Sequence, residues 1–357
     1  MEPSRRRQQP NRDPPALTGA SLPVRAQSEE FQPPGWLRNS HLQSMLASMT
    51  VRRGPVVRRA APVVAAERQM LLDCGDGVRL QCFRSTPPGC SGTPAVLLHG
   101  WEGSAESLYV LSLAQQLFES GFDVVRLNLR DHGATHHLNR ELFHSCRLPE
   151  VIGAMRSLQG LFPGKLMYLV GFSLGGNFLL RVATDTAGDP SLRIGKVIAV
   201  SPVLDPGATL IALERGIPGY QLYFIRKWMS SLLKKQAAWP ADYDFGHFGK
   251  FTNLRRMTAD LIRHFTEYPT LDDYLNGYSI TGDRLAGLDV PASIITSLDD
   301  PIIPAHSIEG LAHPPSLQLV VTRWGGHCGF LERLTGPTWI ERRIVAELQE
   351  AVAEGGR

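Results

Sequence analysis

Short runs of apolar residues recur along most of this chain, and polar or glycine-containing turns separate them. Brief runs rich in valine, leucine and isoleucine are typical of β-strands that are buried in a sheet. The pattern predicts eight strands, at residues 69–73, 79–84, 95–98, 123–128, 166–170, 196–200, 292–296 and 317–322. The first two runs lie so close together that we expect them to form an antiparallel hairpin at the sheet edge.

Segments with helical periodicity lie between many of these runs, notably at residues 107–120, 148–159 and 177–187. Strands that alternate with helices indicate an α/β fold in which a mostly parallel sheet carries helices on both faces. A longer stretch, about 205–285, separates the sixth and seventh strands and contains three sequences with helical patterns. We therefore predict an eight-stranded α/β domain with a helical insertion at that point.

The residues before the first strand differ in composition from the rest of the chain. Residues 1–30 are rich in proline, arginine and polar side chains, which predicts a disordered basic tail. Residues 31–67 form an N-terminal approach segment, in which apolar residues between 42 and 46 have helical spacing. The part from 51 to 67 is rich in valine, alanine and proline and allows no assignment. The main domain is expected to span residues 68–350.

Composition narrows the class of protein. Of 357 residues, 43% are hydrophobic and 20% are charged, which excludes a mostly disordered chain. The net charge of +3, from 37 basic and 34 acidic residues, gives no reason to expect a nucleic-acid partner. The five cysteines show no CxxC pair, so neither a disulfide framework nor a zinc site is indicated. No apolar run is long enough to span a membrane, and we expect a cytoplasmic location.

One motif with a chemical meaning follows the fifth predicted strand directly. Residues 171–175 read GFSLG, the G-x-S-x-G pattern, and a predicted helix comes next. In that context the serine lies on a sharp turn from strand to helix, where its hydroxyl is exposed at the edge of the sheet. The pattern therefore predicts Ser173 as a catalytic nucleophile.

A serine nucleophile needs a histidine base and a carboxylate that orients it, in the order Ser, acid, His on this architecture. The loop after strand 292–296 reads SLDDPIIP and the loop after strand 317–322 contains GGHCGF. We predict Asp300 as the acid and His327 as the base, while Asp299 is a reserve acid or a capping residue. Taken singly, Asp300 could be a turn aspartate before proline, and His327 a loop histidine bonded to backbone.

The tetrahedral intermediate of acyl transfer also requires hydrogen-bond donors for its oxyanion. The third strand runs into HGWEG at residues 99–103, and the backbone N–H after His-Gly is suitably placed. We predict that the backbone amides of Trp101 and Leu174 form the oxyanion hole. His99 is expected to brace this loop rather than to act as a base.

Three further features have simpler interpretations. The stretch NLRDHGATHHLN, at residues 128–139, lacks convincing metal-ligand spacing, and we expect it to be a loop near the site entrance. Cys328 has no separate base to activate it and is expected to be a passive thiol. The aromatic and basic stretch 220–235 favours a helix that packs over the sheet, with contact at a membrane surface as the alternative.

With these motifs in place, the chain resembles the YheT-like branch of the α/β-hydrolase superfamily, which includes abhydrolase-domain-containing proteins and yeast medium-chain ester synthases. The resemblance covers about residues 31–345 and is carried by PPGWLRNSHLQS, LLHGWEGSAES, GFSLGGNFLL, SLDDPIIP and GGHCGF. It implies the α/β-hydrolase fold, a triad of Ser173, Asp300 and His327, and no cofactor. The loop 128–133 departs from the common pattern, because Asp131 stands where glycine is usual.

The leading functional hypothesis is a serine hydrolase that cleaves carboxylic esters of short to medium acyl chains through an acyl-enzyme on Ser173. One alternative is an acyltransferase that passes the acyl group to an alcohol or lysolipid. Another is a non-catalytic hydrolase-fold binding protein, against which the intact triad argues. The expected partner is a small-molecule ester or lipid, with no nucleic acid, no membrane span and room for peripheral membrane contact. The sequence indicates no oligomeric state.

Overall fold

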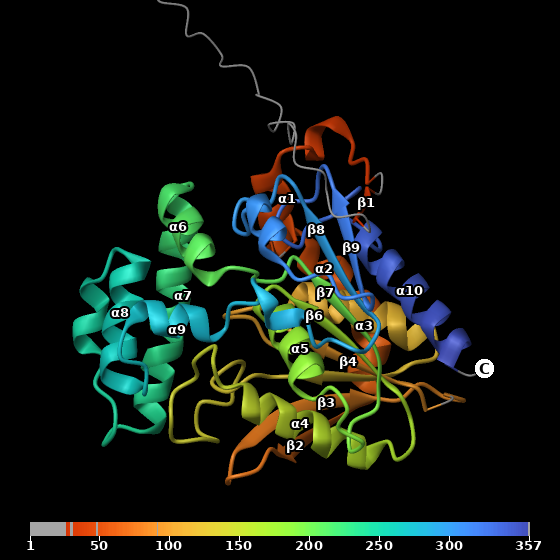
Figure 1. The fold of residues 1–357 in the computed structure, drawn as a ribbon, viewed down its shortest axis with the longest axis horizontal. Helices are drawn as coiled ribbons and strands as arrows, with labels where there is room; N and C mark the ends of the chain where they lie inside the picture. Colours follow the sequence, from red (N-terminus) through yellow and green to blue (C-terminus); the bar gives the residue numbers. More distant parts are fainter. Residues whose placement is uncertain (1–25, 29–30, 48, 91, 356–357) are drawn as a thin grey trace, which may run out of the picture.

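The centre of the molecule is a twisted, mostly parallel sheet of nine strands (Figure 1). The computed structural model describes residues 26–28, 31–47, 49–90 and 92–355. Along the sheet the order is β1-β9-β8-β7-β6-β4-β5-β3-β2. The eight predicted strands are all present, as β2 (Glu67–Asp73), β3 (Arg79–Ser85), β4 (Pro94–Leu98), β5 (Asp123–Leu127), β6 (Met167–Phe172), β7 (Ile194–Val200), β8 (Ala292–Ser297) and β9 (Leu317–Thr322). The antiparallel hairpin of β2 and β3 is also confirmed.

The ninth strand was not predicted. Strand β1 (Ala26–Ser28) pairs in parallel with β9, so the prediction of disorder for residues 1–30 is wrong at these three positions. The rest of the predicted tail lies outside the described residues. An edge strand offers backbone N–H and C=O groups to any extended segment, whatever its side chains. Pairing of this kind leaves no hydrophobic pattern in the sequence.

Both faces of the sheet are covered by helices, because side chains alternate between faces along each buried strand. On β4, Val96 and Leu98 belong to one hydrophobic cluster, whereas Ala95 and Leu97 belong to another. The first cluster includes side chains of α4 (Leu148–Leu161) and α5 (Leu174–Asp185). The second includes side chains of α2 (Thr50–Ala65), α3 (Leu108–Glu119) and α10 (Trp339–Gly355). The layered α/β architecture is therefore confirmed.

Helix α2 occupies the stretch that allowed no assignment from sequence. It contains two prolines, Pro55 and Pro62, and each removes one backbone donor from the helix. Val56, Ala60 and Val63 are nevertheless buried, in the same cluster as the side chains of α3. Packing of this apolar stripe stabilises a helix that local propensity disfavours. A shorter helix, α1 (Ser40–Leu46), precedes it, as the spacing predicted.

The helical insertion between β7 and β8 is present as predicted and forms a group beyond α5, on the side of the molecule away from α10 (Figure 1). It consists of α6 (Pro206–Arg215), α7 (Pro218–Ala238), α8 (Leu254–Phe265) and α9 (Leu271–Gly277). Side chains of Asp205, Asn253 and Thr270 cap α6, α8 and α9, each by accepting a backbone N–H. In the described part of the chain, no helix has the length and apolar character that crossing a membrane requires.

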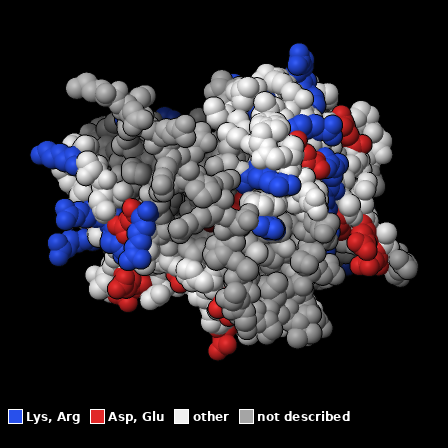
Figure 2. All heavy atoms as spheres, turned by 90° about the horizontal axis from the view of Figure 1, so that it is seen from above, with Lys and Arg blue, Asp and Glu red and all other residues white. Residues whose placement is uncertain are grey.

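Charge is distributed without one dominant sign. On the face seen in Figure 2, basic and acidic side chains of the described residues lie intermixed at both ends of the molecule. This agrees with the net charge of only +3 over the full sequence. A mixed surface of this kind provides little long-range steering for a charged substrate.

Two glycines of α4 allow a matched test of how tightly this helix packs. A Cβ added at Gly153 would lie 2.0 Å from the carbonyl oxygen of Cys74, whereas one at Gly160 would meet nothing within 4 Å. We expect Gly153→Ala to lower the free energy of unfolding by about 1–3 kcal/mol, because backbone must shift to relieve the clash. Gly160→Ala should raise it by about 0.5–1 kcal/mol through helix propensity. Equal effects of the two variants in urea unfolding would contradict this packing.

Candidate active site

Ser173 lies at the turn between β6 and α5 with φ 52° and ψ −118°. A positive φ is costly for a residue with a Cβ, by about 1–3 kcal/mol, and such residues cluster at functional sites. The turn is also too tight for side chains on either side of it. A Cβ at Gly171 would lie 2.5 Å from the backbone of Gly175, and one at Gly175 would lie 2.4 Å from the carbonyl oxygen of His99. The local geometry agrees with the strand–turn–helix arrangement that the motif predicted.

The loop after β4 lies directly against this turn. A Cβ added at Gly100 would lie 3.1 Å from the Cβ of Ser173, and the Gly100 N–H donates to the Tyr109 hydroxyl at 3.0 Å. His99 is fully buried beneath the loop. Its Nδ1 bonds the Gly100 carbonyl oxygen at 2.7 Å, while its Nε2 accepts the N–H of Leu129 at 3.2 Å.

These two partners determine the protonation of His99. Because Nδ1 faces a carbonyl and must donate, and Nε2 faces an N–H and must accept, the ring is neutral with its proton on Nδ1. Burial, with the nearby His132, holds the pKa of His99 well below its ordinary value. Both ring nitrogens are therefore used in hydrogen bonds that hold the loop. This agrees with the expectation that His99 braces the loop and is not the base.

The two amides predicted for the oxyanion hole come from these neighbouring segments. Trp101 follows Gly100 in the loop, and Leu174 is the first residue of α5. Within the part of the chain that the structure describes, neither backbone N–H donates to a protein acceptor. The start of a helix carries such unpaired donors together with the positive end of the helix dipole. Both residues also line the same cavity.

The predicted acid and base are in contact. Asp300 Oδ2 lies 2.9 Å from His327 Nδ1, and the Asp300 side chain is completely buried. The other oxygen, Oδ1, accepts the backbone N–H groups of Ile302 at 2.8 Å and Ile303 at 3.0 Å. One carboxylate oxygen is thus held by the backbone while the second faces the imidazole, which orients the ring through Nδ1.

Two opposing effects act on the protonation of His327. Burial lowers the pKa of its ring, but the charge of Asp300 and the hydrogen bond to it, with a contribution from Cys328, raise it more. The net result is a pKa well above the ordinary value of 6.5. A general base holds a proton during the reaction, so a histidine in that role requires a carboxylate that stabilises its imidazolium form.

Asp299 has a different position from its neighbour. Its Oδ1 accepts the N–H of Gly326 at 2.9 Å, so it holds the backbone of the base-bearing loop and not the ring. Its Oδ2 is buried without a hydrogen-bond partner. Burial accordingly raises the pKa of Asp299 to about 6. Of the two acids considered from sequence, Asp300 is the one that contacts His327.

Ser173, Asp300 and His327 follow the carboxyl ends of β6, β8 and β9 and therefore lie at the same edge of the sheet. Strand β7, which lies between β6 and β8, links the two sides. The Ser173 N–H donates to the Val200 carbonyl at 2.9 Å, and the Cys328 N–H donates to the Ser201 hydroxyl at 3.3 Å. The loop that bears His327 therefore shares the end of β7 with the serine turn.

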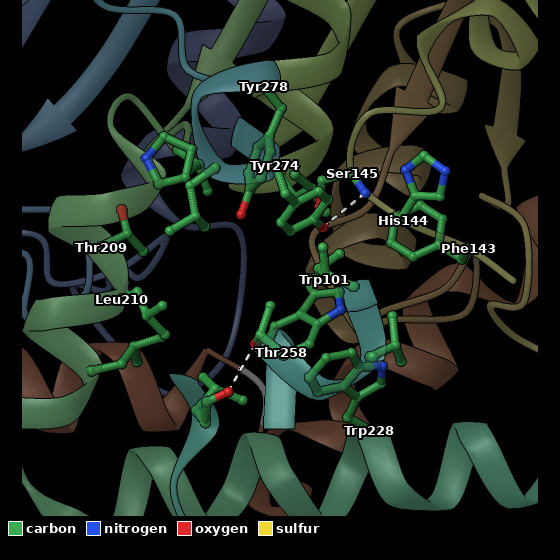
Figure 3. A pocket seen from close by; sticks show the side chains of 18 residues that line it. Trp101, Phe143, His144, Ser145, Thr209, Leu210, Trp228, Thr258, Tyr274 and Tyr278 are labelled. Atoms are coloured by element: carbon green, nitrogen blue, oxygen red, sulfur yellow. Dashed lines mark hydrogen bonds between the residues drawn. The ribbon is translucent and has the colours of Figure 1, made fainter. Parts of the chain in front are cut away.

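A cavity lies between this edge of the sheet and the helical insertion (Figure 3). Its volume is about 100 Å³. Its walls are mainly apolar and aromatic, formed by Trp101, Phe143, His144, Ser145, Leu174, Val203, Pro206, Thr209, Leu210, Leu213, Trp228, Leu254, Thr258, Leu261, Ile262, Tyr274, Leu275 and Tyr278. The sequence motifs identified only Trp101 and Leu174 among them, because the others come from helices and loops whose packing no local pattern specifies.

The loop 128–139 also contacts the insertion. Asp131 adopts φ 57°, a conformation that glycine would adopt without strain, and its carboxylate accepts from Lys235 of α7 at 2.9 Å. Both side chains of this ion pair are almost fully buried. His132 bonds the Arg130 carbonyl through Nδ1, and His136 bonds the hydroxyl of Ser231. The stretch thus braces α7, and among the described residues no group of metal-ligating side chains is found.

The chain is similar to several known proteins. A family profile, described as the alpha/beta hydrolase fold, matches residues 93–334. The chain is 24% identical to Phospholipase ABHD3 of Homo sapiens, over 92% of this chain and 80% of that protein. It is 28% identical to the Putative esterase YheT of Escherichia coli, over 89% and 92% respectively. With Protein ABHD15 of Homo sapiens the identity is 26%, over 92% and 70%.

Solved structures show the same fold at lower identity. The Pyrococcus furiosus esterase Pf2001 superposes with a TM-score of 0.53 at 14% identity, over 84% of this chain and 93% of that one. The 2,6-dihydroxy-pseudo-oxynicotine hydrolase superposes with a TM-score of 0.54 at 16% identity, over 84% and 72%. At such identities the likeness concerns the arrangement of strands and helices alone.

The contact between Asp300 and His327 can be tested by titration. Asp300→Asn removes the charge that raises the pKa of His327, and we expect that pKa to fall by about one pH unit or more. The matched variant Asp299→Asn keeps an acceptor for Gly326 and should leave it near the wild-type value. NMR titration of the ring, assigned with His327→Gln, measures both.

The same ion pair has a predictable effect on stability. The folded-state pKa of His327 lies above the unfolded value. The contribution of the Asp300–His327 pair to the free energy of unfolding is therefore complete below about pH 6.5 and is lost as the pH rises through the folded-state pKa. In the NMR titration described above, an unchanged pKa of His327 in Asp300→Asn would show that the carboxylate does not control the protonation of the ring.

Proposed function

The chain belongs to the alpha/beta hydrolase fold family, as its motifs predicted, and on that premise we propose that it is a serine hydrolase of carboxylic esters with short to medium acyl chains. The observation that carries the proposal is the hydrogen-bonded Asp300–His327 pair at the sheet edge that also bears the strained Ser173. The names of the relatives, a phospholipase and a putative esterase, support an ester or lipid substrate.

In the proposed reaction, the Ser173 hydroxyl oxygen attacks the ester carbonyl carbon while Nε2 of His327 accepts the hydroxyl proton. Asp300 holds Nδ1–H and stabilises the imidazolium that forms. The tetrahedral intermediate collapses, the bond to the alcohol oxygen breaks, and His327 returns the proton to that oxygen. The product of this half-reaction is an acyl-enzyme on Ser173 and a free alcohol.

The second half-reaction repeats these steps with water. His327 removes a proton from the water molecule, whose oxygen attacks the acyl carbonyl, and the released serine oxygen regains the proton. In both halves, the N–H groups of Trp101 and Leu174 would donate to the negative oxygen. Loss of one such donor typically costs about 3–4 kcal/mol of transition-state stabilisation.

The cavity supports an apolar acyl group as the part of the substrate that is recognised. Trp101 and Leu174 belong both to its wall and to the proposed oxyanion hole, so a chain attached to the reacting carbonyl would enter it. Each methylene group transferred from water to such a site contributes about 0.8 kcal/mol. The limited space favours acyl chains of short to medium length.

The nucleophile can be tested with an alkyl fluorophosphonate, which reacts with activated serines. We expect the wild-type protein to be labelled at Ser173, and Ser173→Ala to lose both labelling and ester turnover. His327→Gln should reduce the labelling rate by 100-fold or more, because no base remains to take the proton, about 10²–10⁴-fold being typical. Ser191→Ala, an exposed turn serine, is the control and should react normally. Labelling that survives in Ser173→Ala would eliminate the mechanism.

Cavity depth can be tested with p-nitrophenyl esters of graded chain length. In the wild type, kcat/KM should rise roughly fourfold per methylene until the cavity is full, as burial of about 0.8 kcal/mol implies. Thr258→Phe places a ring in the cavity wall and should move the optimum to a shorter chain. Arg256→Ala changes an exposed residue of the same helix and should leave the optimum in place. An optimum unaffected by Thr258→Phe would mean that the acyl chain binds elsewhere.

A further inference from the structure

Helix α1 lies against the loop that carries His327, although almost 300 residues of sequence separate them. The backbone N–H of His327 donates to the Ser44 hydroxyl at 2.8 Å. The same hydroxyl donates its own proton to the Ser40 carbonyl at 2.7 Å, one turn earlier in the helix. Because its proton is directed to Ser40, the Ser44 oxygen presents a lone pair to the base residue.

Gln43 holds a later part of the same loop, at Leu331. Its side chain is fully buried, and its Oε1 accepts the N–H of Leu331 at 2.7 Å. Its Nε2 donates to the carbonyls of Leu331 and Leu37, both at 2.9 Å. A buried amide that makes three hydrogen bonds to the backbone is well determined in position and costly to replace.

The sheet side of the loop is anchored at Cys328, whose N–H donates to the Ser201 hydroxyl, and at Gly326. Ser297 Oγ donates to the Gly326 carbonyl at 3.0 Å, and Asp299 accepts the Gly326 N–H, so both reach the same residue. Among these anchors, the contact to the backbone N–H of His327 itself comes from α1. At Gly326 the loop approaches α1 so closely that a Cβ would lie 2.4 Å from the Ser40 carbonyl oxygen.

The loop needs such support because its backbone is strained. Cys328 has φ 56° and Phe330 has φ 47°, both in the region that residues with a Cβ avoid. Strained conformations of this kind persist only where the surroundings determine them fully. The contacts from α1 bracket the two strained residues, at 327 on one side and at 331 on the other.

We propose that Ser44 and Gln43 are positioning residues for His327, which hold its loop in the conformation that presents the ring to Asp300 and Ser173. The proposal rests on the function proposed above, since His327 is taken as the base. It gives the approach segment, which leads into β2, a role in the chemistry. Neither residue belongs to the cavity wall.

Ser44→Ala removes the acceptor for the His327 N–H without opposing helix formation, since alanine favours helices. We expect kcat to fall about 10–100-fold, as a small misplacement of a catalytic group can cost 100-fold. KM for a short p-nitrophenyl ester should stay within about twofold, because α1 does not line the acyl cavity. Ser44→Thr restores the hydroxyl and should recover most of the activity.

Gln43→Met, which keeps the length of the side chain but removes its hydrogen bonds, is the second variant. We expect the same kcat-specific loss, measured at a temperature where unfolding curves show the variant folded. Met45→Ala changes an exposed side chain of the same helix and is the matched control. The positioning role is overturned if folded Ser44→Ala and Gln43→Met both keep the kcat of Met45→Ala, or if Ser44→Thr is as impaired as Ser44→Ala.

A second readout separates this proposal from the proposed function. The NMR titration of the His327 ring requires no turnover, and the pKa that it measures depends on the placement of the ring beside Asp300 and Cys328. Tyr220 of α7 is a further titratable group and lies near Ser44. If α1 positions the ring, the pKa of His327 should fall toward 6.5 in Ser44→Ala and stay unchanged in Met45→Ala. Absence of labelling and turnover in the wild type would refute the hydrolase proposal. An unchanged titration in Ser44→Ala would refute the positioning role.

Discussion

The contact on which the site depends is made between backbones, where the start of α5 packs against the end of β4. A Cβ at Gly175 would lie 2.4 Å from the carbonyl oxygen of His99 and 2.5 Å from that of Leu98. This approach places Ser173 and the loop of Trp101 side by side. The candidate nucleophile and the candidate oxyanion donors are therefore held by one backbone contact, and preorganised donors of this kind stabilise charge as it develops.

The parallel sheet brings the remaining groups to that unit. Parallel strands end at the same edge, so loops that follow β8 and β9 converge beside the turn after β6. The end of β7 lies between them and hydrogen-bonds both sides, through Val200 and Ser201. The buried Asp300 then aligns the imidazole of His327 with one oxygen while backbone N–H groups hold the other.

The helical insertion completes the cavity through contacts with the same loop. The Trp101 ring stacks on Phe224 at 5.3 Å and meets the edge of Trp228 at 5.2 Å, both from α7. Further along α7, Lys235 forms its buried ion pair with Asp131. Replacement of one member of such a pair would leave the other charge buried and unpaired. The position of α7, and with it the shape of the cavity, is thus linked to the loop beside the candidate nucleophile.

Much of this arrangement could be predicted from local patterns. The apolar runs predicted eight of the nine strands. The glycines around Ser173 predicted a sharp turn, in which the backbone approaches too closely to leave room for a Cβ at Gly171 or Gly175. Ser173, Asp300 and His327 each follow a predicted strand, which indicated that all three lie at one edge of the sheet. These features are properties of single segments, and periodicity or steric size specifies them without knowledge of the rest of the fold.

What sequence patterns did not specify depends on segments that meet only after folding. Strand β1 forms because β9 offers an unpaired edge, and α2 forms despite two prolines because its apolar stripe is buried with α3. The loop motif favoured Asp300 over Asp299 as the partner of His327. Only the hydrogen bonds show it, because Asp300 contacts the ring whereas Asp299 contacts the backbone of Gly326. Sequence by itself determined the strand-and-helix order and the chemical groups. Tertiary structure decided which side chains share a cavity and what holds the base, because hydrogen-bond partners distant in sequence leave no periodic signal.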